Sequence, residues 1–175
     1  MGLCGCGQRM AVLTIAILFS PLLQGQPCPE LKSLRSMFMD HSTLEQAEAS
    51  ERMAVRAMQT CPEPCRPVVE AHRWASHART ADFGLNMMDR WNRFNHAVAQ
   101  LDSLVKAHPE LDVLRAHRLS VTGKAPGFLG GDTHWREDAR ATIAVSQTDF
   151  WAESPKFSEW MVQLATQIQD KTSSE

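Results

Sequence analysis

The stretch that decides the fold of this 175-residue chain runs from Trp91 to Val145 and reads WNRFNHAVAQLDSLVKAHPELDVLRAHRLSVTGKAPGFLGGDTHWREDARATIAV. Its apolar residues recur at intervals of three and four as far as Val105, which predicts an amphipathic helix with Trp91 at the start of its core-facing stripe. Pro109 separates this helix from a second helical pattern that ends at Gly123. A loop rich in Gly and Pro then leads to a third helix that begins with acidic residues. The stretch therefore predicts consecutive helices joined by short turns.

Two helices are predicted at the start of the folded part, over residues 29–40 and 44–60. Ser42 precedes the second one and stands three residues before Glu45, which is the spacing of a capping box. Pro62 ends the second helix. The short break between the two helices predicts an antiparallel hairpin.

Two further helices are predicted beyond Pro67 and Pro155, since proline is well suited to the first turn of a helix. The face of the first one that carries His72 is rich in small residues, which would let a neighbouring helix approach closely. Gly84 is expected to end this helix as a left-handed cap. Trp151 falls between helical patterns, so we expect it in a loop as an exposed contact.

No segment alternates polar and apolar residues over a sustained length, and Tyr is absent. The sequence therefore predicts a single all-α domain over residues 26–175, with six or seven helices. Antiparallel helical hairpins stacked side by side are typical of a tetratricopeptide-like array. The explicit tetratricopeptide signature of Trp, Leu-Gly and Tyr at fixed offsets is not present.

The central stretch also carries a block of residues in a recognisable order: Phe94-Asn95, Leu101, Val105, Pro109-Glu110-Leu111, LRAHRLSV at 114–121, and Pro126-Gly127-Phe128-Leu129-Gly130. This block resembles a family of uncharacterised exported bacterial proteins. In that family a helix ends in an acidic-Pro turn, and an R-x-x-R-L-S helix, a P-x-F-L-G loop and a helix beginning with acids follow. The resemblance covers about a third of the chain. It implies an all-helical, tetratricopeptide-like, extracytoplasmic protein, and it transfers no catalytic residue.

Residues 1–25 have the pattern of a secretory signal peptide. A basic residue precedes the apolar run 10–23, which is shorter than the roughly 20 residues that a transmembrane helix needs. With cleavage after Gly25, the protein would be exported to the periplasm or secreted, with no transmembrane segment left. Two lipid-anchored alternatives are a bacterial lipoprotein modified at Cys28 and a chain myristoylated at Gly2.

Three cysteines follow the signal segment, namely Cys28, Cys61 and Cys65. An oxidising compartment favours one disulfide and leaves one thiol. In a helical hairpin the start of the first helix lies near the end of the second, so we expect Cys28 to pair with Cys61, with Cys65 as the other candidate. The CxxxC spacing and the missing βαβ pattern make a redox-active centre the weaker interpretation.

Charged residues flank the Gly/Pro loop on both sides. Arg115 and Arg118 lie three apart on the helix before it, and Glu137 and Asp138 lie in the helix after it. The two arginines could hold an anion as a fork, but we expect internal salt bridges to the two acids. The loop 125–131 could also cradle an anion at a helix start. It lacks the Gly-Lys-Ser/Thr of a phosphate loop, so we expect a structural turn.

Composition narrows the class of function. The formal net charge is −2, and no cluster of Lys and Arg follows the apolar run, which argues against a nucleic-acid partner. Neither an HExxH nor a Gly-x-Ser-x-Gly motif occurs, and we predict no catalytic residue, metal site or cofactor. The sequence favours a non-enzymatic interaction or scaffold module with a protein or peptide partner. The alternatives are a hydrolase or metal-dependent enzyme with a site in a helical cleft, and a lipid-anchored envelope protein.

Overall fold

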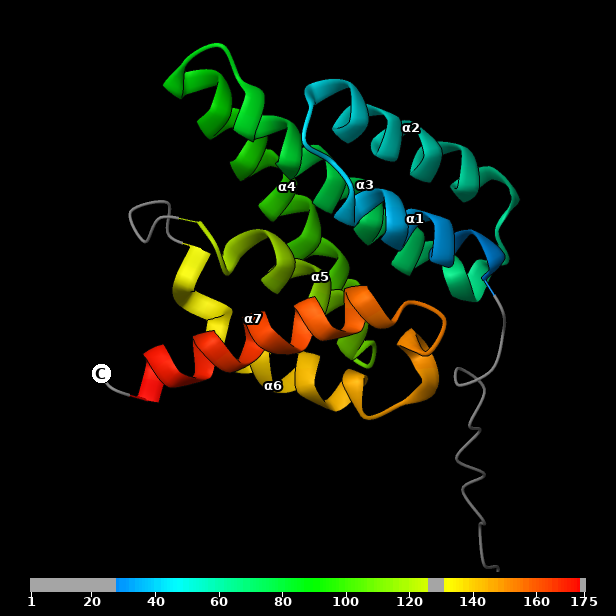
Figure 1. The fold of residues 1–175 in the computed structure, drawn as a ribbon, viewed down its shortest axis with the longest axis vertical. Helices are drawn as coiled ribbons and strands as arrows, with labels where there is room; N and C mark the ends of the chain where they lie inside the picture. The colour runs from blue at the N-terminus through cyan, green and yellow to red at the C-terminus, as the bar shows by residue number, and fades with distance from the viewer. Residues whose placement is uncertain (1–27, 126–130, 174–175) are drawn as a thin grey trace, which may run out of the picture.

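The computed structural model describes residues 28–125 and 131–173, and over these residues the fold is all-α without a strand (Figure 1). Its helices are α1 (Pro29–Met39), α2 (Leu44–Thr60), α3 (Arg66–Thr80), α4 (Met87–Ala107), α5 (Asp112–Thr122), α6 (Trp135–Ser146) and α7 (Pro155–Ser173). Short 3-10 segments join several of them, namely η1 (Glu63–Cys65), η2 (Ala81–Phe83), η4 (Gly131–His134) and η5 (Asp149–Trp151). The predicted fold class is confirmed.

Consecutive helices pack against one another in the order of the chain: α2 with α3, α3 with α4, α5 with α6, and α6 with α7. The two central helices, α3 and α5, contact each other and so join the first half of the molecule, α1 to α4, to the second half, α5 to α7. α1 also contacts α7, and Figure 1 shows both helices on the same side of the molecule. In an open repeat array each unit contacts only its neighbours. The tetratricopeptide-like arrangement therefore stays a prediction.

The N-terminus of α2 is capped one residue later than predicted. Thr43 is the N-cap: its Oγ1 accepts a hydrogen bond from the Gln46 amide at 3.3 Å, and Gln46 Oε1 accepts one from the Thr43 amide at 3.2 Å. Gln46 Oε1 also accepts from the Ser42 amide at 2.7 Å. The predicted pairing of Ser42 with Glu45 is wrong: Gln46 is the third residue after the N-cap Thr43, and its side chain accepts from both amides before the helix.

The turn after α3 also differs from the prediction. Gly84 has φ of −59° and ψ of 141°, which is extended and not left-handed. Glycine is needed there for space: a Cβ atom at Gly84 would lie 2.5 Å from Cγ of Arg90 and 2.9 Å from Oδ2 of Asp89. Gly84 therefore lets the chain pass close to the start of α4.

α2 and α3 approach each other through small side chains, as the small-residue face of α3 predicts. Ser50 and Ser76 meet at the centre of this interface, where their buried hydroxyl oxygens are 2.8 Å apart. The surrounding residues are small and buried: Ala47, Ala54, Ala57, Ala71 and Ala75. Close contact along two helices brings many atoms into van der Waals range, and these contacts hold α3 against α2.

Two tryptophans lie opposite to expectation. Trp91 is 39% exposed, because the first turns of α4 project beyond α2 (Figure 1). Trp151 is 1% exposed, since η5 folds back and places its ring 5.6 Å from that of Phe157. The predicted core position of Trp91 and the predicted exposure of Trp151 are both wrong.

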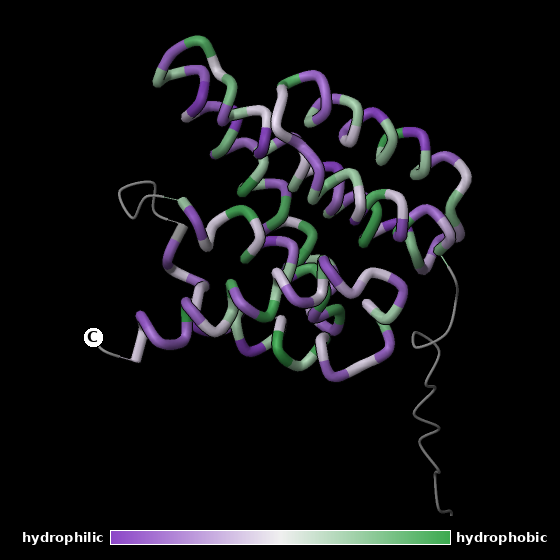
Figure 2. Tube along the Cα trace, in the orientation of Figure 1, coloured by the Kyte–Doolittle hydropathy of each residue, from purple (hydrophilic) through white to green (hydrophobic). Residues whose placement is uncertain are grey.

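The hydrophobic core has a main part and a satellite. The main part includes Leu34, Phe38, Val69, Leu114 and Met161, and each fully buried large apolar side chain contributes about 1.5–3 kcal/mol. A smaller cluster joins the later helices: Leu119, Trp135, Ala139, Leu164, Ala165 and Ile168. Figure 2 shows the apolar segments of the helices interleaved with polar ones. Among the described residues, none of the helices combines the length and apolar character needed to cross a membrane.

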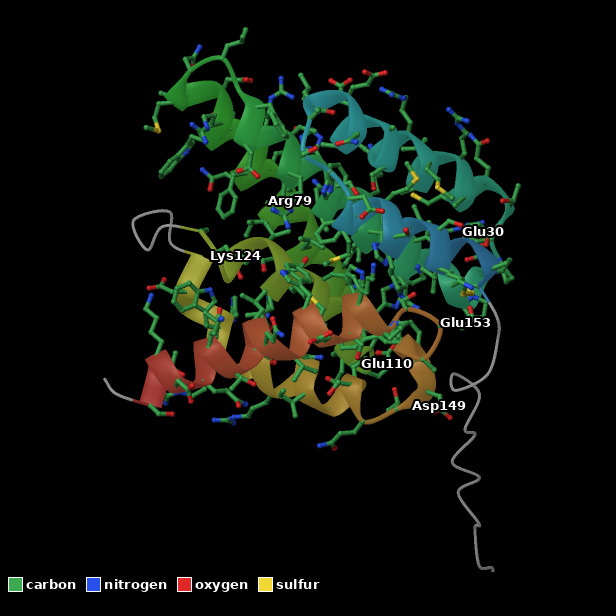
Figure 3. All side chains as sticks on the ribbon, in the orientation of Figure 1. Glu30, Arg79, Glu110, Lys124, Asp149 and Glu153 are labelled. Atoms are coloured by element: carbon green, nitrogen blue, oxygen red, sulfur yellow. A yellow bond between two sulfur atoms is a disulfide. The ribbon has the colours of Figure 1, made fainter. Side chains whose placement is uncertain are left out.

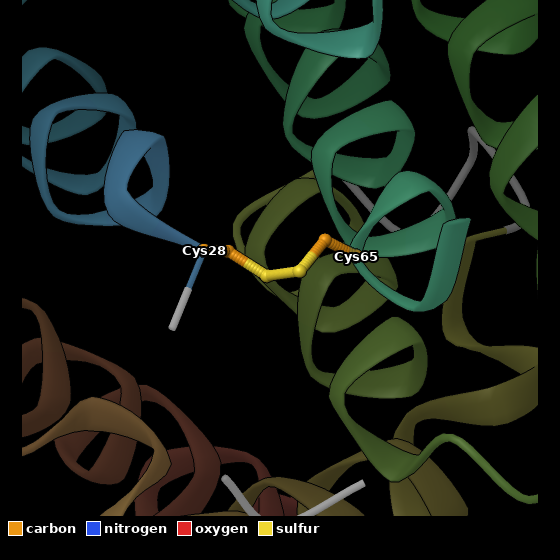
Figure 4. The surroundings of a disulfide bond; sticks show 2 residues. All are labelled: Cys28 and Cys65. Carbon is orange, nitrogen blue, oxygen red and sulfur yellow. A yellow bond between two sulfur atoms is a disulfide. The ribbon is translucent and has the colours of Figure 1, made fainter. Parts of the chain in front are cut away.

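A disulfide joins Cys28, just before α1, to Cys65 at the end of η1 (Figure 4). The Cα atoms are 6.1 Å apart and the two residues are 37 positions apart in sequence. Cys61 is a buried free cysteine. The expected pairing of Cys28 with Cys61 is wrong, because the chain continues past α2 through Pro62 and η1 before it comes alongside the start of α1.

Candidate functional site

The structure brings together the four charged residues that flank the Gly/Pro loop. Arg118 is buried, and its Nε and Nη2 atoms donate to Oδ2 and Oδ1 of the fully buried Asp138 at 2.8 and 2.7 Å. Its Nη1 donates to Oδ1 of Asp102 at 2.8 Å. Burial opposes the charged form of Arg118, but the hydrogen bonds and charges of Asp138 and Asp102 outweigh it and raise its pKa. This bidentate pair fastens α5 to α6.

Arg115 lies nearer the surface. Its Nε donates to Oε1 of Glu137 at 2.8 Å, and its Nη1 donates to the Pro109 carbonyl at 2.7 Å. The hydrogen bond from Arg115 is the main cause of the lowered pKa of Glu137. An open surface hollow of about 370 Å³ lies beside this pair, lined by Pro109, Asp112, Arg115, Glu137, Arg140, Ala141 and Ala144. Both predicted arginines are thus bonded to acids, and residues 126–130 of the loop proposed as an anion cradle lie outside the described residues.

A second polar group lies in the core where sequence reasoning expected only packing. Arg35 of α1, His72 of α3 and His117 of α5 are all buried, and we call them the Arg–His cluster. The two imidazole rings meet edge to face with centroids 4.2 Å apart. Arg35 is close enough for its charge to act on both histidines. Helices from both halves of the chain therefore contribute to one buried cluster of basic side chains.

Most polar atoms of the Arg–His cluster lack a protein partner. Among residues 28–125 and 131–173, no hydrogen-bond partner exists for Nε and Nη2 of Arg35, for either ring nitrogen of His72, or for Nε2 of His117. His117 Nδ1 donates to the Val113 carbonyl at 2.7 Å, so its Nε2 carries a lone pair in the neutral ring. A buried polar atom without a partner costs about 1–3 kcal/mol. Several such atoms in one place are unusual and indicate more than packing.

Electrostatics keeps the two histidines neutral. Burial, the neighbouring His117 ring and the charge of Arg35 hold the pKa of His72 well below its ordinary value. Burial lowers the pKa of His117 to about 4, with Arg35 adding to the effect and the Val113 hydrogen bond opposing it. Burial also lowers the pKa of Arg35 to about 10, so the guanidinium stays charged at neutral pH, and Glu153 supports that charge. The cluster therefore carries a net charge of about +1 at neutral pH.

Aromatic rings surround the Arg–His cluster. The Arg35 guanidinium lies over the Phe150 ring, 4.8 Å from its centroid. Phe157 of α7 is 6.0 Å from the His72 ring and 6.3 Å from the His117 ring. The indole nitrogen of Trp151, which packs on Phe157, is buried and also has no hydrogen-bond partner in the described parts of the chain. These rings exclude water and strengthen any electrostatic contact inside them.

Two basic side chains, Arg79 and Lys124, lie over aromatic rings of α1 and α7. Arg79 lies over the Phe38 ring near the end of α1, at 5.2 Å, and both Arg79 and Lys124 lie over Trp160 at 6.0 and 5.3 Å. Figure 3 shows these two basic residues toward one side of the molecule, and four acids toward the end where α1 begins: Glu30, Glu110, Asp149 and Glu153. Stacking on aromatic rings holds the two cations in place.

The turn into α4 forms an exposed apolar tip. Leu85 is 97% exposed, Met87 71% and Met88 66%, and Phe83 and Trp91 are exposed beside them. We call these five residues the apolar tip. The tip stands at the outer end of the molecule, where Figure 2 shows hydrophobic colour at the turn before α4. An exposed group of large apolar side chains is typical of a binding surface, and sequence reasoning missed this one because it assigned Trp91 to the core.

No group of three or more His, Cys, Asp or Glu side chains in the described residues is arranged to hold a metal ion. The disulfide uses the Cys28 sulfur, which a lipoprotein anchor would need for its lipid. Comparison of the chain with protein-family models, with curated proteins and with solved structures finds no match. Function must therefore be argued from the geometry of the chain itself.

Proposed function

We propose that the protein is a non-enzymatic interaction module that binds a protein or peptide partner through the apolar tip. The observation that carries this proposal is the exposure of Leu85, Met87 and Met88, which are large apolar side chains within four consecutive positions of the chain. Flexible methionines adapt to a partner surface, and tryptophan is enriched among the residues that dominate binding energy. Trp91 supplies such a residue one turn into α4.

The backbone beneath the apolar tip is held by polar contacts, so the tip is formed before a partner binds. Arg90 Nε donates to the Ala81 carbonyl at 3.0 Å. Arg93 donates from Nε to Oδ1 of Asp89 at 3.0 Å and from Nη1 to the Thr80 hydroxyl at 3.2 Å. A preformed surface loses little conformational entropy on binding, which supports a role in recognition.

The proposed partner shares the compartment of the protein. The signal-like residues 1–25 and the Cys28–Cys65 disulfide both suit an exported protein. Stacked helical hairpins of the tetratricopeptide-like kind would present the tip at the end of a rigid scaffold. We therefore expect an exported protein or a peptide as partner, and no nucleic acid.

Site-specific photo-crosslinking in the producing cell tests this proposal. A crosslinking amino acid at position 88 should capture one defined partner, whereas the same group at position 48, on the exposed face of α2, should not. The purified partner should then bind the Leu85→Asp, Met88→Asp variant roughly 30-fold more weakly than the unaltered protein, which corresponds to about 2 kcal/mol. Equal affinity for the two proteins would show that the tip is not the binding surface.

A further inference from the structure

The buried guanidinium of Arg35 presents a free bidentate edge. Its Nε and Nη2 atoms point two N–H donors in parallel along one side of the group, and neither has a hydrogen-bond partner in residues 28–125 or 131–173. The side chain is 3% exposed, so bulk water does not reach it freely. A buried charge is costly unless it is paired, and two parallel N–H donors match an anionic partner with two oxygen atoms.

Arg118 shows what the same edge binds elsewhere in this chain. Its Nε and Nη2 atoms donate to the two carboxylate oxygens of Asp138 at 2.8 and 2.7 Å. Both arginines are buried, Arg35 on α1 and Arg118 on the central helix α5. The difference is that Arg118 has its carboxylate supplied by α6, whereas the described residues supply none to the edge of Arg35.

The surroundings of Arg35 complete a site for one negative charge. His72 brings a further N–H donor in its neutral form, since neither of its ring nitrogens has a partner in the described residues. His117 Nε2 is an acceptor in the neutral ring and takes no part in holding a carboxylate. The guanidinium is the only one of the three groups that is charged at neutral pH. Glu153, the acid whose charge acts on it, is exposed and contributes no oxygen to the Nε–Nη2 edge, so a singly charged anion on that edge balances the buried cluster. A doubly charged phosphate or sulfate would leave an unpaired negative charge in an apolar core.

We propose that the Arg–His cluster binds the carboxylate group of a small organic acid, with the Nε–Nη2 edge of Arg35 on its two oxygens and a ring nitrogen of His72 as an additional donor. The aromatic rings of Phe38, Phe150 and Phe157 shield the group from water. This site is independent of the apolar tip.

Equilibrium unfolding in urea tests the site, because unfolding and refolding expose the cluster and allow a ligand to enter. The protein is purified as the producing cell makes it, with its disulfide intact, and is unfolded at neutral pH in sodium acetate or in sodium chloride of equal ionic strength. A ligand that binds only the native state lowers the unfolding equilibrium constant by a factor of 1 + [L]/Kd. We expect acetate to lower this constant by that factor. Sodium sulfate should act only through general salting-out, which does not depend on Arg35.

Two variants and one spectroscopic signal assign the effect to Arg35. Arg35→Met removes the charge but keeps an apolar side chain of similar length, so it should fold and lose the acetate effect. Arg52→Met removes an exposed arginine that pairs with Glu48, and should keep the acetate effect. In the unaltered protein, acetate should also shift the Nε–H resonance of Arg35, an observation that does not depend on any variant folding.

The outcomes are distinct. An acetate effect that follows the factor 1 + [L]/Kd and requires Arg35, together with the resonance shift, supports the carboxylate site. An equal response of the unaltered protein and the Arg35→Met variant, or an Arg35 Nε–H resonance that acetate leaves unmoved, overturns it and leaves buried water as the partner of the cluster. An Arg35-dependent effect of sulfate that is larger than that of acetate would overturn the assignment to a carboxylate.

Discussion

Acidification should destabilise this protein before its surface carboxylates titrate, because two histidines are buried as neutral rings. The pKa of His117 is lowered from 6.5 to about 4 in the folded chain, mainly by burial. The unfolded chain takes up a proton near its ordinary pKa, whereas the folded chain does so only near the lowered one. The free energy of unfolding therefore falls as the pH drops below about 6.5 and stops falling near pH 4.

The size of the effect follows from the difference between the two pKa values. One pKa unit corresponds to about 1.4 kcal/mol, so His117 alone removes about 3 kcal/mol by pH 4 and about 2 kcal/mol by pH 5. His72 acts in the same direction, since its pKa is also lowered by burial, by the neighbouring His117 ring and by the charge of Arg35. The free energy of unfolding of most domains is about 5–15 kcal/mol, so a loss of this size is a substantial part of the total.

Urea unfolding at about pH 7.5 and about pH 5 measures the loss, and the protein's five tryptophans provide the fluorescence signal. Chloride is the anion in all buffers, so that no carboxylate occupies the Arg–His cluster. His117→Gln removes the titrating group and should shrink the loss by about 2 kcal/mol. His108→Gln changes a partly exposed histidine and should leave the loss unchanged.

Comparing each variant with the unaltered protein cancels the contributions of other groups. Asp138, whose pKa is raised by burial, and Glu51, whose pKa is lowered by His77 against the effect of burial, titrate alike in all three proteins. A protein that is equally stable at both pH values would refute the reasoning, as would a His117→Gln variant that keeps the whole loss.

Three further predictions concern the packing and bonds of the scaffold, and urea unfolding measures each of them. Asp138→Ala leaves the buried Arg118 without its main counter-charge and should lower the free energy of unfolding by about 3–5 kcal/mol. Glu137→Gln removes an exposed partner of Arg115 and should lower it by less than about 1 kcal/mol. Equal costs would contradict the difference in burial between Asp138 and Glu137. Replacing Cys28 and Cys65 by Ser opens a loop of 37 residues and should cost about 4 kcal/mol in the chain-entropy model, and unchanged stability would count against the bond. Gly123→Ala places a Cβ atom 2.8 Å from a backbone oxygen of the preceding turn and should cost about 1–3 kcal/mol; a neutral result would show that the turn can move aside.

Local signals in the sequence predict the helices well. The prolines and polar residues around α2 give its bounds, because helix ends depend on residues only a few positions away. The same holds for the inward position of His72, which follows from the periodicity of α3. These features need no knowledge of what the helix packs against.

Tertiary contacts determine the features that sequence reasoning missed. Trp151 is buried because η5 folds back onto α7, and no local pattern reports that return of the chain. The Arg–His cluster depends on α1, α3 and α5 meeting, so Arg35 looks from sequence like an ordinary polar residue of an amphipathic helix. The disulfide partner likewise changes with the path of four residues after Cys61. Each of these depends on contacts between residues that are distant in sequence.

The disulfide turns residues 28–65 into a closed ring of chain. A protease that cuts one peptide bond within this ring, for instance in the turn at 40–43, leaves both new ends attached to the same molecule. Such a nicked protein should run as one band on a non-reducing gel and as two after reduction. α1 is therefore lost only after two separate events, cleavage and reduction, and the Arg–His cluster, to which α1 contributes Arg35, outlasts a single cut.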